Sequence, residues 1–365
     1  MPTDDDLTAV EPSPSVVIPT HNRRERILAL VGRLLADDGD GEIVVVDDCS
    51  RDGTADALAA LVAGSPRLHV LALTEPAGAS RARLAGARAA TGDVLVMLDD
   101  DVMPAPGLVA KHVAHHAAYR ATSPDDPDGL LVLGYMPTTV PSPLPAGAFA
   151  TALYAQEYEN RCAGYERDPS TIMTALWLGN ASVSRARYLH AFESGLMPTF
   201  PYRHEDRILG IVLRELGVHG VFDRSIHSTH EHNRPLPKFL KDAYDNGRGR
   251  EEIHRLYPEV VPDDAEQEYL SDLPAPLRAL VSSTSREPVR RAVVGTLSTG
   301  IRATGRLGAR GPETTLAKIA RRVELMHGAR AAGGAPRGCA AGPFLGDGRP
   351  PRGSGALRFC GGRAD

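Results

Sequence analysis

Short apolar runs alternate with amphipathic segments from residue 15 onward. The runs have the length and composition of strands buried on both faces of a parallel sheet. They lie at residues 15–19, 42–47, 68–73 and 93–98. A helix is predicted after the first run, because Ile27, Leu28, Val31, Leu34 and Leu35 recur at helical spacing. The alternation predicts an α/β fold in which a mainly parallel sheet is flanked by helices.

The pattern changes after residue 120. Residues 122–129 and the Pro-rich stretch 136–147 predict loops. A helix is expected near 205–216, followed by a pair of strands around 218–223 and 225–230.

This change of pattern divides the chain into four expected parts. A polar N-terminus and a Gly/Arg/Pro/Ala-rich tail contain too little apolar surface to offset the entropy of ordering, so we expect both to be disordered. The parts are residues 1–14 (disordered), 15–234 (α/β domain), 235–330 (helical extension) and 331–365 (disordered tail).

Composition excludes several classes of protein. The net charge of -5 over 365 residues provides no broad basic field, which argues against a nucleic-acid partner. No apolar run reaches the roughly 20 residues needed to span a bilayer, and the N-terminus is acidic where a signal peptide is basic. The four cysteines lack metal-site spacing. We therefore expect a cytoplasmic protein and leave open a peripheral contact with the inner face of the membrane.

Acidic residues follow two of the predicted strands. Asp47 and Asp48 end the second run, and Asp99, Asp100 and Asp101 end the fourth. One aspartate at such a place commonly caps the next helix. Three adjacent carboxylates repel one another unless a cation compensates them, which favours a divalent ion, Mn²⁺ or Mg²⁺, shared with substrate phosphates.

Five stretches resemble, in order, the signatures of family 2 glycosyltransferases with the GT-A fold. They are SVVIPTHNR, VVVDDCSRDGT, GASRARLAGARAATGDVLVMLDDDVMP, WLGNASVSRARY and HEDRILGIVLRELG, between about residues 15 and 232. The resemblance implies a nucleotide-binding half over 15–120 and an acceptor-binding, catalytic half over 121–234. It also implies an inverting, non-processive, metal-dependent enzyme that moves one sugar from a nucleotide diphosphate, expected to be UDP, to an acceptor hydroxyl.

The resemblance leaves the acceptor as a glycan, a lipid-linked molecule or a small molecule. Assembly of polysaccharide, cell envelope or natural products is the expected context. The Q-x-x-R-W signature of processive synthases is missing, because the only glutamines are Gln156 and Gln267 and neither fits it.

The resemblance also implies residues that bind the nucleotide sugar. Pro19 and Thr20 would line the nucleotide pocket, and Asp48 would bind the nucleobase. Arg83 stands where the family often has an arginine near the base.

The D-x-D motif comprises Asp99 to Asp101. By the resemblance, Asp99 would bind the ribose and Asp101 the metal, while Asp100 stands at the variable middle position and could assist in nucleotide binding. A further metal ligand is expected among the histidines of 225–233, with His230 preferred over His227.

Glu205 and Asp206 precede an apolar helical pattern. Acidic residues there can simply stabilise the first helical turn. With the resemblance, Asp206 becomes the expected general base, and Glu205 stands beside it in the catalytic pair. Trp177 is expected either on the acceptor side of the cleft or in the core.

Other interpretations remain. His112, His115 and His116 share one helical face, which we expect to be solvated. A sugar-phosphate nucleotidyltransferase would have a Gly-rich loop after the first strand, where this chain has PTHNRRER. A catalytically inactive GT-A module that only binds nucleotide or glycan would not need Asp206.

Overall fold

The computed structural model describes residues 11–37, 41–198, 204–262 and 265–333, and it contains one eight-stranded mixed sheet. The four strands expected in the N-terminal half are confirmed as β1 to β4. The strands are β1 Pro14–Thr20, β2 Glu42–Asp47, β3 Leu68–Ala72, β4 Val94–Leu98, β5 Val102–Pro104, β6 Leu130–Tyr135, β7 Asn180–Ser184 and β8 His219–His230.

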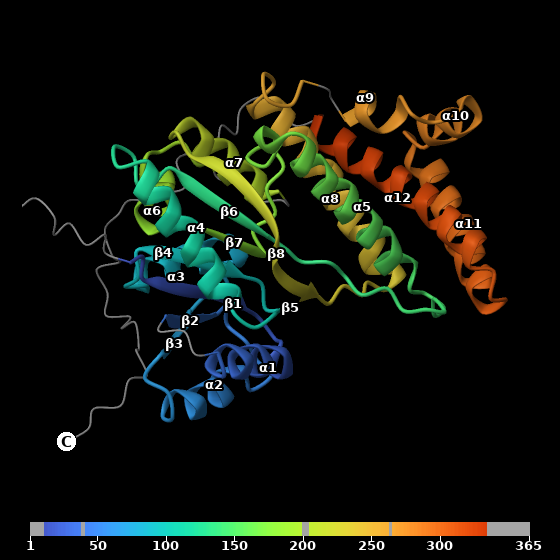
Figure 1. Ribbon diagram of the computed structural model, residues 1–365. Helices are drawn as coiled ribbons and strands as arrows, with labels where there is room; N and C mark the ends of the chain where they lie inside the picture. Colours follow the sequence, from blue (N-terminus) through green and yellow to red (C-terminus); the bar gives the residue numbers. More distant parts are fainter. Residues whose placement is uncertain (1–10, 38–40, 199–203, 263–264, 334–365) are drawn as a thin grey trace, which may run out of the picture.

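Helices cover both faces of the sheet and continue beyond it (Figure 1). Seven follow or separate strands: α1 Arg24–Leu35, α2 Thr54–Val62, α3 Ala79–Ala89, α4 Leu108–Thr122, α5 Phe149–Arg167, α6 Arg185–Glu193 and α7 Glu205–Glu215. A 3-10 turn, η1, spans Pro169–Thr171. The later helices are α8 Leu236–Leu256, α9 Ala265–Leu270, α10 Ala275–Ser283, α11 Glu287–Arg306 and α12 Arg310–Gly333.

One half of the sheet is parallel. Strands lie in the order β3-β2-β1-β4, and Val17 of β1 is paired with Val44 of β2 on one side and Met97 of β4 on the other. The chain runs outward from β1 to β3 and then returns to the opposite side of β1. This reversal of direction opens a crevice at the carboxyl ends of β1 and β4, where parallel sheets bind ligands.

The other half of the sheet is mixed. β7 is antiparallel to both β4 and β6, while β8 is parallel to β6. The pairing of Leu98 with Asn180 brings the start of β7 to the end of β4. A segment from the second half of the chain therefore enters the crevice.

The strand pair expected around 218–223 and 225–230 is wrong, because both runs belong to the single strand β8. The Asp223 carboxylate accepts hydrogen bonds from the backbone N–H and hydroxyl of Ser225, an arrangement typical of a turn. Here it produces an irregularity opposite Gly134 and Tyr135 of β6, and the strand continues past it.

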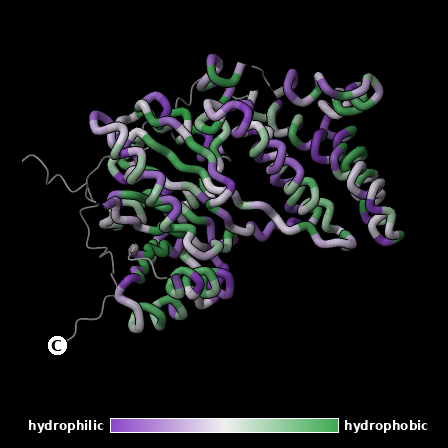
Figure 2. The backbone as a smooth tube through the Cα atoms, viewed as in Figure 1, coloured by the Kyte–Doolittle hydropathy of each residue, from purple (hydrophilic) through white to green (hydrophobic). Residues whose placement is uncertain are grey.

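The strands bury alternate residues in two apolar clusters, as period-two alternation requires. Val17 faces the cluster that includes α3, α6 and α7. Val16 and Ile18 face the cluster that includes α1, α2 and α4. Figure 2 shows the strands as largely hydrophobic segments beneath helices of alternating character. Burial on both faces holds the ends of the strands in place at the crevice.

The expectation of a solvated face on α4 is wrong for His112 and His116, which are buried. His112 contacts the Asn180 Oδ1 atom at 3.0 Å and the Ser182 hydroxyl at 2.8 Å, and His116 contacts the same hydroxyl at 2.9 Å. Burial lowers the pKa of His112 to about 4, so its imidazole is neutral at pH 7. His115 remains partly exposed and pairs with Asp223. Polar residues on β7 make burial of these two rings tolerable.

α5 packs with the C-terminal helices beside the sheet (Figure 1). Their shared apolar cluster contains Phe149, Ala150, Leu153, Phe239, Ile301, Ala317 and Ala320. Within the described chain, no helix is both long and apolar enough to cross a membrane. β1 begins at Pro14 and α12 extends to Gly333, while most of 1–14 and of 331–365 lies outside the described residues.

The close packing of α8 against α12 can be tested by substituting a glycine at the contact. A Cβ atom at Gly247 would lie 1.9 Å from the Leu325 carbonyl oxygen, whereas one at the exposed Gly295 on α11 would meet nothing within 4 Å. We expect Gly247→Ala to lower the free energy of unfolding by at least about 2 kcal/mol, because backbone cannot yield to the methyl group. Gly295→Ala should raise it by about 1 kcal/mol. Denaturant unfolding measures both, and equal effects would contradict this packing.

Candidate active site

A cleft of about 980 Å³ opens at the carboxyl ends of β1, β2 and β4. Its far wall comes from α5, α7, α8 and α12. Every site residue expected from the sequence lines it: Pro19, Thr20, Asp48, Arg83, Asp99, Asp100, Asp101, Glu205, Asp206 and His230. The fold therefore brings residues that are up to 211 positions apart in the chain to one cavity.

Asp48 fixes the loop that leads into α3. Its carboxylate accepts backbone hydrogen bonds from Ala77 at 2.6 Å and Gly78 at 2.9 Å. Its own N–H donates to the Thr20 carbonyl at 2.9 Å. Asp48 thus joins β1, β2 and the start of α3, while its side chain still lines the cleft.

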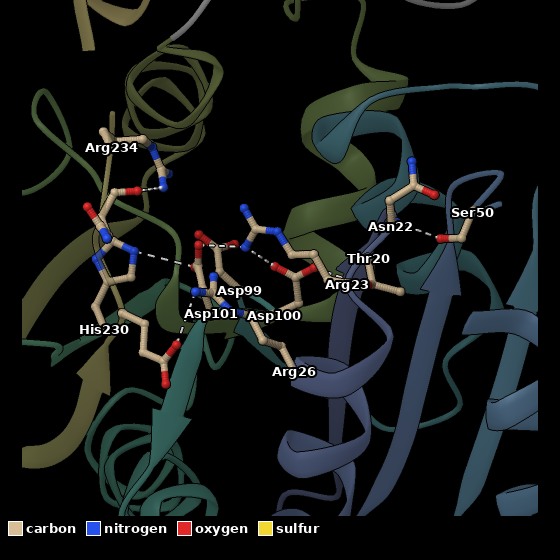
Figure 3. A network of polar contacts seen from close by, with 12 residues as sticks. Thr20, Asn22, Arg23, Arg26, Ser50, Asp99, Asp100, Asp101, His230 and Arg234 are labelled. Atoms are coloured by element: carbon tan, nitrogen blue, oxygen red, sulfur yellow. Dashed lines mark hydrogen bonds and ion pairs between the residues drawn. The ribbon is translucent and has the colours of Figure 1, made fainter. Parts of the chain in front are cut away.

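Strand pairing places His230 beside Asp101. β5, which directly follows Asp101, pairs with β8 so that Val102 lies opposite His230. The Glu231 N–H donates to the Asp101 carbonyl at 2.9 Å. The His230 Nε2 atom consequently lies 3.4 Å from an Asp101 carboxylate oxygen, and Figure 3 shows the ring pointing at the aspartates.

Arg23, at the start of α1, approaches the same aspartates (Figure 3). Its guanidinium lies 2.7 Å from Asp100 and 2.6 Å from Asp101. Asp100 also accepts the Thr20 hydroxyl at 2.8 Å. The sequence analysis missed Arg23, although a cation following β1 at the same sheet edge as three acids was a usable signal.

The two aspartates differ in acidity. Burial raises the pKa of Asp100 to about 6, despite the opposing charge of Arg23. Burial also acts to raise the pKa of Asp101, but the hydrogen bond and charge of His230, together with Arg23, hold that pKa well below its usual range. Asp101 is therefore ionised at neutral pH.

The side chains of Asp101 and His230 are chemically suited to bind a divalent cation whose remaining ligands come from a substrate. Carboxylate oxygen and imidazole nitrogen are both ligands for such ions. The His230 Nδ1 atom is buried without a hydrogen-bond partner among the described residues. No group of three His, Cys, Asp or Glu side chains suited to a metal occurs in the described ranges, so phosphate oxygens or water would supply the other ligands.

His227 lies elsewhere. Its ring packs against Tyr135 with centroids 5.6 Å apart, and it is not part of the cleft lining. Of the two histidines left open by the sequence, only His230 lies beside an aspartate of the motif.

Arg83 connects the motif to the second half of the chain. Its buried guanidinium pairs with Asp99 and lies 3.6 Å from an Asp206 oxygen. The sequence placed this arginine near a nucleobase, whereas its contacts in the structure are with these two carboxylates. Arg83 therefore holds both acidic groups at the same cleft.

Both carboxylate oxygens of Asp206 are held, Oδ2 by a hydrogen bond and Oδ1 by the ion pair with Arg83 at 3.6 Å. Its Oδ2 atom accepts the Leu178 N–H at 3.0 Å, and its buried Oδ1 atom has no hydrogen-bond partner among the described residues. Burial raises the pKa of Asp206 to about 7, with the charge of Glu205 adding to the effect and Arg83 opposing it. A carboxylate with this pKa is suited to accept a proton near neutral pH.

Trp177 forms part of an aromatic wall. It lines the cleft, stacks on Tyr154 with centroids 5.4 Å apart and also packs against the core. The Arg161 guanidinium lies 5.6 Å from its ring centroid. Trp177 therefore lines the cleft and packs against the core, and α5 supplies cleft residues that no motif had indicated.

Comparison with known proteins identifies the N-terminal half. Residues 15–125 match the family described as glycosyl transferase family 2. The uncharacterized glycosyltransferase YfnE of Bacillus subtilis is 35% identical over 104 residues, which are 28% of this chain and 26% of the relative. The putative teichuronic acid biosynthesis glycosyltransferase TuaG of the same species is 36% identical over 96 residues, which are 26% of this chain and 38% of the relative.

A solved structure extends the likeness to most of the chain. The mannosyltransferase PcManGT from Pyrobaculum calidifontis, in complex with GDP-Man and Mn²⁺, superposes with a TM-score of 0.51 over 87% of this chain and 88% of its own, at 16% identity. This likeness concerns the fold. The protein has a GT-A fold, and residues 15–125 match the glycosyl transferase family 2 model.

The acidity of Asp206 can be measured directly. We expect its carboxyl group to titrate with a midpoint near 7, because burial penalises the charged form. Carbon-13 NMR of the aspartate-labelled full chain, with Asp206→Asn to assign the signal, provides the readout. Arg83→Gln should move the midpoint upward, because it removes the opposing positive charge. A midpoint below about 5 would contradict the site described here.

Proposed function

We propose that the protein is an inverting glycosyltransferase that moves one sugar from a nucleotide diphosphate to an acceptor hydroxyl. One observation carries this proposal. Asp206, a half-buried carboxyl with a pKa raised to about 7, shares a cleft with the aspartates that end β4 and lies 3.6 Å from the arginine that pairs with Asp99. The family match and the fold support the same conclusion.

The donor would lie along the carboxyl ends of β1, β2 and β4. Pro19, Thr20 and Asp48 line the part of the cleft where a nucleoside fits, and Asp99 and Asp100 continue that wall. UDP remains the donor nucleotide expected from the sequence resemblance. GDP is the second candidate, because the mannosyltransferase of the same fold was solved with GDP-Man.

Asp101 and His230 would hold Mn²⁺ or Mg²⁺, which would supply positive charge to the leaving diphosphate. Arg23 keeps Asp100 and Asp101 together against their mutual repulsion. Because β5 is paired with β8, His230 is aligned with Asp101 by the backbone. The proposed ligands are thereby preorganised.

Asp206 would act as the general base. The Asp206 carboxylate, held in place by the Leu178 N–H, would take the proton of the acceptor hydroxyl. The acceptor oxygen then bonds to the anomeric carbon as the bond from that carbon to the diphosphate oxygen breaks. A single displacement inverts the anomeric centre and needs one base. Glu205 assists by raising the pKa of its neighbour.

The first test is the loss of the proposed base. Asp206→Asn should reduce transfer by about 10²- to 10⁴-fold while nucleotide binding is retained. In the wild type, kcat/KM should rise with pH through a pKa near 7, because the base must be deprotonated. Glu215→Gln, at the exposed far end of α7, is the matched control. Transfer by Asp206→Asn at the wild-type rate would exclude Asp206 as the base.

The second test concerns the proposed metal ligand. Asp101→Ala should weaken Mn²⁺-dependent binding of UDP or GDP by at least about ten-fold. Calorimetry with and without Mn²⁺ measures this change, and the exposed Asp56→Ala serves as the control for a lost negative charge. An unchanged Mn²⁺-dependent affinity would remove Asp101 from the metal site.

A further inference from the structure

The cleft contains two arginines that differ from its other cations. Arg321 pairs with Glu157 at 2.6 Å, and Lys241 pairs with Asp245 at 2.5 Å. Arg161 of α5 and Arg207 of α7 line the same cleft, yet neither forms an ion pair with any carboxylate in the described part of the chain. No carboxylate of a described residue lies within ion-pair distance of either guanidinium, and the charge of Glu268 acts on Arg207 only at longer range.

The hydrogen bonds of these arginines are also incomplete. The Nε–H of Arg207 donates to the Thr174 carbonyl at 2.9 Å, which is the single hydrogen bond of that guanidinium to a described residue. The Nε atom of Arg161 is buried and has no described hydrogen-bond partner. Each guanidinium has five N–H donors, so most of them remain available to a ligand.

The two arginines influence each other. Burial lowers the pKa of Arg207 to about 10, and the charge of Arg161 is the next contribution. Holding two like charges together in a partly buried cleft is unfavourable unless an anion compensates them. A bound oxyanion would remove this cost and satisfy the free donors.

The two arginines lie on the side of the cleft that contains Asp206, the proposed general base. Arg207 follows Asp206 in the chain, and Arg161 lies over Trp177, whose neighbour Leu178 donates to Asp206. The contact with Asp99 is made by Arg83 and not by this pair. A molecule that presents its hydroxyl to Asp206 would therefore also meet Trp177 and the two guanidinium groups.

We propose that Arg161 and Arg207 form a subsite for an oxyanion carried by the acceptor, with Trp177 packing against the sugar or polyol that bears it. This inference rests on the proposed function, because it takes the molecule at Asp206 to be the acceptor. The forked guanidinium binds phosphate and carboxylate in the same bidentate manner. The acceptor class is thus a phosphorylated or uronic-acid glycan or polyol, and not a neutral one.

The chain supplies its own probe for this subsite. Trp177 is the only tryptophan in the sequence, so tryptophan fluorescence reports on the ring next to Arg161. Inorganic phosphate, glycerol 3-phosphate and glucuronate would be titrated into the full chain at constant ionic strength, with glycerol and glucose as neutral controls. We expect a saturable change with at least one anion and none with the neutral compounds.

Variants then assign the response to the pair. Arg207→Gln leaves Arg161 over the reporter ring and should weaken anion binding by at least about ten-fold. Arg161→Lys keeps the positive charge but loses the forked guanidinium, so its loss of anion affinity should be intermediate. Arg321→Gln removes a positive charge from the same cleft and should change the affinity less than about two-fold. Melting temperatures establish that each variant is folded.

Three results would overturn the proposal. The first is no fluorescence response to any anion, and the second is a loss of anion affinity in Arg321→Gln equal to that in Arg207→Gln. The third is a loss of Mn²⁺-dependent UDP or GDP binding in Arg207→Gln equal to its loss of anion affinity. The last would assign the pair to the donor diphosphate. A response to the phosphate probes alone assigns a phosphorylated acceptor, and a response to glucuronate alone assigns a uronic-acid acceptor.

Failure of the proposed function is measured separately. Mn²⁺-dependent hydrolysis of UDP- and GDP-sugars by the wild type tests use of the donor without any acceptor. If hydrolysis occurs and no anion binds at Trp177, only the oxyanion subsite is excluded. If neither donor is hydrolysed or transferred, the transferase proposal fails, and the Trp177 titration still decides whether an anion binds to the pair.

Discussion

The repulsion among carboxylates at one edge of the sheet is the constraint on which the site depends. Asp99, Asp100 and Asp101 end one strand, and Asp206 reaches them from a helix in the second half of the chain. Arg23 at the start of α1 and Arg83 of α3 compensate this charge. Because each arginine contacts two carboxylates, the acids remain close together in a partly buried cleft.

The segment before and within β7 connects the two halves. Leu178 donates to Asp206, the Gly179 carbonyl accepts from the Asp99 N–H, and the buried Asn180 amide donates to the Ile226 carbonyl. The neutral imidazole of His112 contacts the Oδ1 atom of Asn180. Leu178 and Gly179 thus connect the proposed base to the aspartate motif, and Asn180 connects β7 to β8.

Local sequence patterns predicted the strands that carry the site well. The strands ending in Asp47 and Leu98 were predicted to within about a residue, because each is a short apolar run buried on both faces. Predictions based on polar spacing were less successful. The histidines of α4 looked solvated because their partners, Asn180 and Ser182, lie some 70 residues away in the chain. α5 carried no motif, yet it supplies Tyr154 and Arg161 to the cleft.

The sequence by itself determined which elements form, and it placed acids at the carboxyl ends of the strands, because apolar periodicity is a local property. Only the tertiary structure decided how those acids are used. It paired Val102 with His230, gave Asp206 a raised pKa through burial and left Arg161 and Arg207 without an ion-paired carboxylate among the described residues. Charge compensation and desolvation depend on residues distant in the chain, so local sequence patterns do not contain them.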